Sequence, residues 1–235
     1  MTSTYEQLDI RNVATYPVAD AARYLAIPAG TLRSWLHGRT YPTTNGNKYF
    51  EPLIHLPDSN SPQLSFTNLV EAHVLRVIRQ NHKVRLDKVR TALDYVEQKF
   101  GLPHPLARAQ FQTDGVDLFV ESVGQLINAS RDGQLAMQKT LQQLLQRIEW
   151  DEEGLAQRLF PLIQLQQADA PRVLEIDPRI SFGRPVVVNT GIPADMVIDR
   201  FRAGESLESL ADDYDLGRHQ LEVILRYEMI LSKIE

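Results

Sequence analysis

The 235-residue sequence predicts an α+β fold that is mainly helical. Apolar residues recur at three- and four-residue spacing over much of residues 17–100 and again in the second half of the chain, which is the period of amphipathic helices. Short β-like runs lie between turn residues around residues 49–50, 109–130 and 172–188. The apolar share of 43% is enough for an ordinary core. Breaks in these patterns predict an N-terminal, a β-containing middle and a C-terminal helical unit, at residues 1–101, 102–170 and 171–235.

The net charge of −5 is unevenly distributed along the chain. Residues 17–100 hold eleven Lys and Arg against seven Asp and Glu, while the flanking regions are acidic. Phosphate contacts need such a local positive face and not a basic whole chain. Cysteine is absent, which excludes disulfides and thiolate metal sites and suits a reducing cytosol. The N-terminus lacks a signal-peptide pattern and no apolar run approaches about 18 residues, so we expect a cytoplasmic protein that contacts no membrane.

Two short helices separated by a tight break form the strongest functional signal. The pattern predicts helices at residues 18–25 and 29–38, and Ile27-Pro28 interrupts them because proline can begin a helix but cannot continue one. A helix-turn-helix needs a small residue where its helices cross, and Ala22 meets this need. By pattern alone, an ordinary αα-hairpin with solvated polar residues stays open as the alternative. The second helix directs polar side chains outward, where they can reach DNA: Thr31, Arg33, Ser34 and His37.

A β-hairpin and two long helices are predicted to follow. Asn45-Gly46 lies within residues 39–63 and is the strongest short hairpin signal, so a β-wing is expected there. The next segment, residues 65–82, carries one apolar helical stripe, and the helix after it has a 3-4-3-4 apolar spacing and is closed by Gly101 and Pro103.

Residues 16–100 resemble the MerR-type winged helix-turn-helix. The resemblance rests on VADAARYLAIPAGTLRSWLHG and on the later helices LSFTNLVEAHVLRVIRQ and VRLDKVRTALDYV. It implies contact between double-stranded operator DNA and the recognition helix and wing, through Thr31, Arg33, Ser34, His37, Arg39, Asn47 and Lys48. The wing region is longer and richer in proline than in typical MerR regulators, and no sensor domain with metal-binding cysteines follows.

The middle unit is predicted to combine short strands with one helix. AQFQTDG, VDLFVE and GQLINAS, within residues 109–130, have the pattern of strands around turns, and a Gln- and Leu-rich helix is expected near residues 133–149. Specific DNA binding usually needs two half-sites, which predicts a twofold homodimer. The expected dimer contact is the apolar stripe of this helix, because the thin β unit beside it offers little cover: Leu135, Leu141, Leu144, Leu145 and Ile148.

The C-terminal unit opens with two β-like runs, RVLEI and RPVVV, and ends in a second helix-turn-helix pattern over residues 206–228. A protein-facing or structural role is expected for this pattern, with DNA contact as the alternative. Its acidic residues would repel phosphate within the Debye length of about 8 Å: Glu205, Glu208, Asp212, Asp213 and Asp215.

Residues 172–228 closely resemble a small domain, long described as of unknown function, that is common in bacterial toxin–antitoxin operons. The matching residues are Asp177-Pro178, Ile180, Gly183, Pro185, Thr190, Ile192-Pro193, Ala203-Gly204, Ser206, Ala211 and Asp213-Tyr214. The family more often has Gly-Thr-Arg where this chain has Asn189-Thr190-Gly191. With the MerR-like front end, the whole chain is similar to VapB-type antitoxins, whose operon partner is a PIN-like ribonuclease. This implies two tasks, neutralising that toxin and repressing its own operon.

A guanidinium could block the carboxylates with which PIN-like nucleases hold divalent metal, because it pairs bidentately with carboxylate and stays charged. The C-terminal unit offers five arginines, Arg179, Arg184, Arg202, Arg218 and Arg226, of which Arg184 and Arg226 are the first candidates for toxin binding. For each arginine, a solvated or locally paired side chain stays open as the alternative.

Catalysis has little support in the sequence, so no catalytic residue, metal or cofactor is expected. The six histidines lack metal-ligand spacing, adjacent carboxylates point apart on a helix, and no Gly-rich phosphate loop is present. His73 lies near an apolar stripe and is expected in the core. Two alternatives to the antitoxin remain: a stand-alone MerR-like regulator without a toxin partner, and a DNA-binding head fused to a ligand-binding or enzymatic C-terminal domain.

Overall fold

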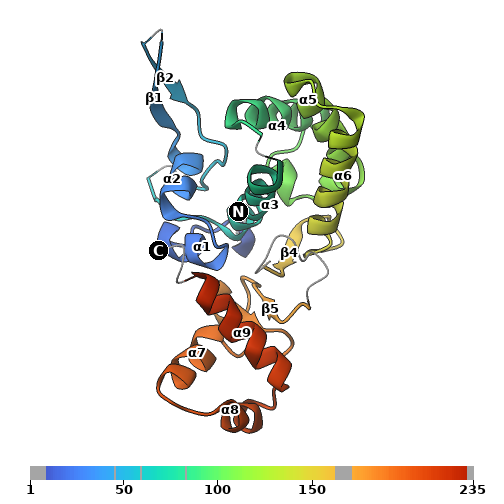
Figure 1. Ribbon diagram of the computed structural model, residues 1–235. Coiled ribbons are helices and arrows are strands. Elements are labelled where there is room, and N and C mark those ends of the chain that lie inside the picture. The colour runs from blue at the N-terminus through green and yellow to red at the C-terminus, as the bar shows by residue number, and fades with distance from the viewer. Residues whose placement is uncertain (1–8, 45, 59, 83, 162–170, 232–235) are drawn as a thin grey trace, which may run out of the picture.

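The computed structural model describes residues 9–44, 46–58, 60–82, 84–161 and 171–231 (Figure 1). Within these ranges the chain is mainly helical, with small two-stranded antiparallel sheets. No helix in these ranges has the length and apolar character needed to cross a bilayer. The predicted α+β class with a helical majority is confirmed.

The N-terminal helices lie where the sequence predicts them. α1 (Val18–Tyr24) and α2 (Ala29–His37) are joined by a turn in which Ala26 adopts a left-handed conformation with φ of 50°. The inward face of α2, with Leu32, Trp35 and Leu36, is buried. Ala22 is buried between the helices, as expected for the small residue at a helix crossing.

The Asn-Gly hairpin is also confirmed. β1 (Arg39–Thr43) pairs antiparallel with β2 (Gly46–Phe50), and Asn45 of the predicted turn lies outside the described residues. In Figure 1 this hairpin continues from α2 and points away from the rest of the molecule.

The long helix α3 (Phe66–His82) lies at the centre of the largest core, with α4 (Leu86–Phe100) following it. Its predicted apolar stripe, which includes Phe66, Leu69 and Val70, is fully buried. A reciprocal cap starts the helix: Ser65 Oγ accepts from the Asn68 N–H, and Asn68 Oδ1 accepts from the Ser65 N–H, each at 3.2 Å.

The predicted strands within residues 109–130 are wrong. This region forms a π-helical turn (Phe111–Gly115) and then α5 (Val116–Ile127). The buried residues Val116, Phe119, Val120 and Val123 recur at spacings of three and four, so one helical face can enter the core. The β-branched content of the segment masked this period. The β content of the middle unit lies later, in β3 (Ile148–Trp150) and β4 (Ala156–Leu159), an antiparallel pair.

The expectation that the next helix exposes its apolar stripe is also wrong. α6 (Arg131–Leu145) packs against α3 and α5, and it ends before Ile148, which belongs to β3. Leu141, Leu144 and Leu145 are buried in the core of their own chain, and only Leu135 of the stripe is exposed. The stripe failed as a dimer surface because α5, which covers it, had been predicted as thin strands. Residues 162–170, the end of the predicted middle unit, lie outside the described residues.

The C-terminal region has a hydrophobic cluster of its own. β5 (Leu174–Glu175) pairs with β6 (Val186–Val187), which confirms the predicted hairpin in a shorter form. α7 (Ala194–Arg202), α8 (Leu207–Tyr214) and α9 (Arg218–Leu231) follow. The predicted second helix pair corresponds to α8 and α9.

The helix α9 joins this region to the helix-turn-helix (Figure 1). Tyr227 Oη donates to the carbonyl oxygen of Tyr24 at 2.7 Å, and Arg23 pairs with Glu228 at 2.9 Å. Ala26, in the turn between α1 and α2, belongs to the C-terminal hydrophobic cluster. The back of the helix-turn-helix therefore packs on the C-terminal region, which leaves its opposite side accessible.

Candidate nucleic-acid interface

The outward face of α2 presents the polar residues that the sequence predicts. Thr31, Arg33 and His37 are exposed, and Ser34 is half-buried. Arg33, Ser34 and His37 follow the i, i+1 and i+4 positions of one helical surface, and Thr31 lies one turn before Ser34. Ser34 Oγ donates to the Thr31 carbonyl at 2.7 Å, which leaves the hydroxyl lone pairs as acceptors.

The hairpin is fixed to the end of α2 by hydrogen bonds. Tyr49 Oη donates to the His37 carbonyl at 2.7 Å, and the N–H groups of Leu53 and Ile54 donate to the Trp35 carbonyl at 2.7 and 3.1 Å. These donors satisfy carbonyls that the helix end leaves without intrahelical partners. The helix and hairpin are thereby held as one unit.

Gly38 permits this close approach. Its φ of 68° is left-handed, and a Cβ built on it would lie 2.2 Å from the Phe50 carbonyl oxygen and 2.6 Å from Tyr49 Oη. Any side chain at this position would therefore displace the hairpin from α2.

The two predicted hairpin residues point to opposite faces. Lys48 pairs with Tyr41 and Asn47 with Pro42, and successive side chains of a strand alternate. Lys48 shares a face with Arg39, whereas Asn47 does not. Arg39, Asn47 and Lys48 are all exposed. The sequence predicted the hairpin but not its register, because the length of the turn decides which residues share a face.

A basic groove lies between the Arg39 face of the hairpin and the junction of α3 with α4. Its cavity of about 190 Å³ is lined by Arg39, Arg79, Arg85 and Asp87, among others. Arg79 Nη1 donates to the Val84 carbonyl, and Arg85 pairs with Asp87 at 3.1 Å while 76% of its side chain is exposed. The sequence did not single out Arg79 or Arg85 as site residues, although the positive charge of residues 17–100 indicated this region.

The C-terminal arginines differ in their partners. Arg179 pairs with Asp177 at 2.7 Å, and Arg202 pairs with Glu228 at 2.6 Å. Arg218 pairs with Glu208 and Glu222, each at 3.1 Å. Of the two predicted toxin-binding residues, Arg184 pairs with Asp195 at 3.2 Å.

Arg226 is the other predicted residue. It is exposed on α9, and within the described ranges it makes no ion pair. Its guanidinium is therefore accessible without breaking a contact inside the described part of the chain.

A strained turn presents an aromatic ring that sequence reasoning missed. Ser181, Phe182 and Gly183 have φ values of 48°, 58° and 73°, and the Phe182 side chain is 87% exposed. Ser181 Oγ donates to the Gly191 carbonyl at 3.1 Å, and Gly183 lies so close to Tyr16 that an added Cβ would be 2.0 Å from Tyr16 Oη. No spacing in the sequence indicates three consecutive left-handed residues.

Within the described ranges, no cluster of three His, Asp or Glu side chains could hold a metal ion. His73 lies in the core, as predicted, and neither ring nitrogen has a hydrogen-bond partner in the described residues. Burial, with the nearby Arg76 and Arg147, lowers the pKa of His73 to about 3, so the ring is neutral near pH 7.

Comparison with protein families identifies both ends of the chain. Residues 14–93 match the family described as "Putative DNA-binding HTH domain", and residues 174–227 match "Protein of unknown function (DUF433)". The first match confirms the predicted helix-turn-helix, and the second confirms the predicted C-terminal domain of unknown function.

Two curated proteins and one solved structure, all from Mycobacterium tuberculosis, are similar to this chain over nearly its whole length. The first is named "Putative antitoxin VapB45" and is 31% identical, with 92% of this chain and 95% of that protein covered. The "Uncharacterized protein Rv2308" is 26% identical, with 90% and 89% covered. The crystal structure of Rv2018 matches with a TM-score of 0.66 and 26% identity, over 91% of this chain and 98% of that one. The identity and coverage of the first match show that the chain belongs to the antitoxin family of VapB45.

Proposed function

We propose that this protein is a DNA-binding antitoxin that represses its own operon and neutralises a PIN-like ribonuclease encoded beside it. The observation that carries the proposal is the exposed, polar and basic α2 face in a chain of the VapB45 family, together with the exposed side chains of Phe182 and Arg226 in the C-terminal region. The protein acts by binding and not by catalysis. In this proposal the DNA-binding unit is residues 1–101 and the toxin-binding unit is residues 171–235. The middle unit, residues 102–170, lies between them in the chain.

In the DNA complex, α2 enters the major groove and the hairpin acts as the wing of a MerR-like domain. Arg33 reads base edges, with Thr31, Ser34 and His37 beside it. Arg39 and Lys48, on one face of the hairpin, contact the phosphate backbone together with Arg79 and Arg85 across the groove. Asn47 contacts DNA from the other face of the wing.

A homodimer places two such surfaces on half-sites about 34–36 Å apart. One helix-turn-helix buries too little surface for specific affinity, which supports this part of the proposal. Light scattering of the purified protein checks it, since a monomeric mass at micromolar concentration would contradict a dimer.

The toxin contacts that we propose are Arg226 and Phe182, which are both exposed in the C-terminal region. Aromatic and arginine side chains dominate the energy of protein interfaces, and the strained turn presents the Phe182 ring to solvent. Arg184 also contributes to toxin binding, once a toxin carboxylate replaces Asp195 as its ion-pair partner. The alternative without a toxin, a stand-alone regulator, leaves this exposed ring without a role.

Co-expression with the adjacent reading frame tests the proposal. We expect the tagged chain to co-purify with the neighbouring gene product and to restore growth that this product alone arrests. A neighbouring product that neither binds nor inhibits growth would favour the stand-alone regulator.

A further inference from the structure

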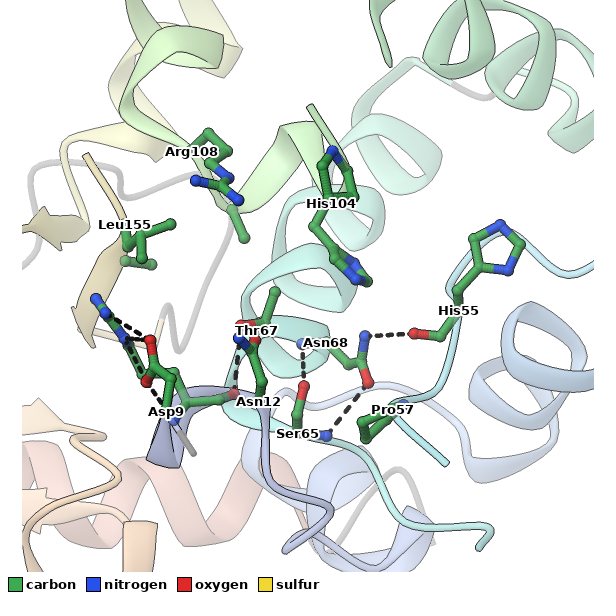
Figure 2. Close-up of a pocket in the computed structure, with 14 residues that line it drawn as sticks. Asp9, Asn12, His55, Pro57, Ser65, Thr67, Asn68, His104, Arg108 and Leu155 are labelled. Carbon is green, nitrogen blue, oxygen red and sulfur yellow. Dashed lines mark hydrogen bonds and ion pairs between the residues drawn. The ribbon is translucent and has the colours of Figure 1, made fainter. Parts of the chain in front are cut away.

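A polar cavity of about 380 Å³ shares no lining residue with the surfaces described above. Figure 2 shows its lining, which comes from the N-terminal segment before α1, the 55–57 loop, the first turn of α3, the 103–108 segment and β4. Its volume is at the lower end of the roughly 300–1,000 Å³ of small-molecule sites. The cavity could therefore enclose a small metabolite.

One acid–base pair at the cavity is internally compensated. Arg11 bonds Asp9 through Nε at 2.9 Å and Nη2 at 2.7 Å, and it also pairs with Asp151. These contacts hold the pKa of the Asp9 carboxyl below its usual range, so it stays ionised and bound to Arg11. Arg11 with its two carboxylates carries a net charge of −1, so an anion in the cavity must be held by other groups.

Arg108 is not compensated in this way. It is half-buried in the wall of the cavity, and within the described residues its guanidinium makes no ion pair. Figure 2 shows the side chain extending toward the space above Thr67 and Asn12. A partly desolvated guanidinium without a carboxylate partner favours an anion that can supply one.

His104 adds a second cationic group. It is held with φ of 55° between two prolines, and its Nδ1 lies 3.1 Å from Oε2 of the buried Glu71. That hydrogen bond raises the pKa of His104 and favours the imidazolium, whereas the nearby Arg108 opposes the charge. The strained backbone and the contact with Glu71 fix the ring at the cavity and leave Nε2 for a ligand.

The first turn of α3 completes the lining. Ser65, Thr67 and Asn68 line the cavity, so the positive end of this 17-residue helix faces it. Asn68 is fully engaged, since its Nδ2 donates to the His55 carbonyl at 2.9 Å and to Glu71 at 3.0 Å. The site is thus ordered by hydrogen bonds before a ligand enters.

We propose that this cavity binds a small metabolite through an oxyanion group, phosphate or carboxylate, held bidentately by Arg108 and assisted by His104 and the start of α3. The site does not depend on the toxin partner. Its His55 wall directly follows Leu53 and Ile54, which hydrogen-bond to the Trp35 carbonyl, so the occupant contacts the segment that holds the recognition helix.

Amide chemical shifts of the full-length protein test the proposal, because phosphate also reaches the basic DNA surface and a local measurement is needed. Inorganic phosphate and malonate are titrated separately at constant ionic strength, and the backbone amides of Thr67, Asn68 and Arg108 are followed. We expect saturable shifts of these amides with at least one probe. The two titrations distinguish a phosphate from a carboxylate preference.

Arg108→Gln is expected to weaken that affinity at least about tenfold, as for the loss of a charge-assisted pair. Arg108→Lys keeps the charge but loses the planar guanidinium, so its affinity is expected to lie between those of wild type and Arg108→Gln. Arg131→Gln, at an exposed arginine of α6, is the matched control and should bind like wild type. Absence of saturable shifts with both probes, or equal affinity in wild type and the two Arg108 variants, would overturn the proposal.

Discussion

At the scale of single residues, Gly38 determines whether the recognition helix and the hairpin form one surface. It combines a left-handed backbone with a carbonyl oxygen 2.2 Å from where a Cβ would lie. The sequence predicted Gly38 as the end of the helix, which needs only local chemistry. It could not predict the contact with Phe50, because that contact depends on how the hairpin folds back.

Gly38→Ala is expected to destabilise the fold by more than about 1 kcal/mol and to weaken operator binding, because strain at positive φ adds to the collision with the hairpin. Gly46→Ala is the control, since Gly46 has φ of 101° but no atom within 4 Å of the added Cβ. Urea unfolding and DNA titration of both variants check this. Equal effects would show that backbone strain alone, and not the collision, is responsible.

Substitutions of Arg33 and Lys48 are expected to affect DNA binding in different ways. Arg33→Ala should cost about 1–3 kcal/mol of operator affinity and relax specificity, because it removes a contact to a base edge. Lys48→Ala should weaken binding to all sequences alike and reduce the salt slope by roughly 0.9, the value for one phosphate contact. Anisotropy titrations over several salt concentrations separate the two effects, with the exposed Arg131→Ala as control. Wild-type behaviour of both variants would show that the DNA surface lies elsewhere.

At the scale of elements, α3 carries a buried histidine, His73, whose protonation favours the unfolded chain. Because the folded pKa of His73 is lowered to about 3, below its unfolded value near 6.5, the unfolded chain binds a proton that the native chain does not. The associated stability is present above about pH 6.5 and is lost as the pH falls toward 3.

His73→Leu is therefore expected to reduce the acid sensitivity of the fold. The loss of unfolding free energy between pH 7.5 and 5 should be about 2 kcal/mol smaller in the variant than in wild type. His219→Gln, at an exposed position of α9, should leave the wild-type loss unchanged. Urea unfolding at the two pH values measures this loss. If His73→Leu lost as much unfolding free energy as wild type, the claim that His73 is neutral in the folded core would be refuted.

The turn at Phe182 is the element that tests the toxin surface. Phe182→Ser together with Arg226→Ala should lower affinity for the neighbouring gene product at least about tenfold, because interface aromatic and arginine residues cost about 2 kcal/mol or more when truncated. The stability of the chain should hardly change, since the ring is 87% exposed. Calorimetric titration measures the affinity. Tyr95→Ser, at an exposed tyrosine of α4, is the control, and equal binding by it and the double variant would remove this surface from the proposal.

The sequence predicted some elements better than others for physical reasons. Asn45-Gly46 encodes a hairpin through local backbone preferences, and α2 has a proline at its start and a glycine at its end. The strand prediction for residues 116–127 was wrong because valine and phenylalanine favour strands locally, whereas burial against α4 and α6 selects a helix. Arg79 and Arg85 belong to the groove only through the packing of α3, α4 and the hairpin.

At the scale of the whole molecule, the two proposed binding surfaces are connected by one packed junction. α9 contacts α1 through Tyr227 and Glu228, and the strained turn at Gly183 touches Tyr16 just before α1. In the proposed complex, a toxin seated on the C-terminal region would contact the junction that supports the helix-turn-helix. We therefore expect toxin occupancy and operator affinity to be coupled.

Titration of labelled operon-upstream DNA with the purified protein tests the central claim most directly. Anisotropy at physiological salt should show the upstream fragment bound at least about 10³-fold more tightly than a scrambled fragment of equal length and composition. Addition of the neighbouring gene product should shift that affinity. Equal affinity for the two fragments would contradict the account, because it would leave α2 with no sequence to read.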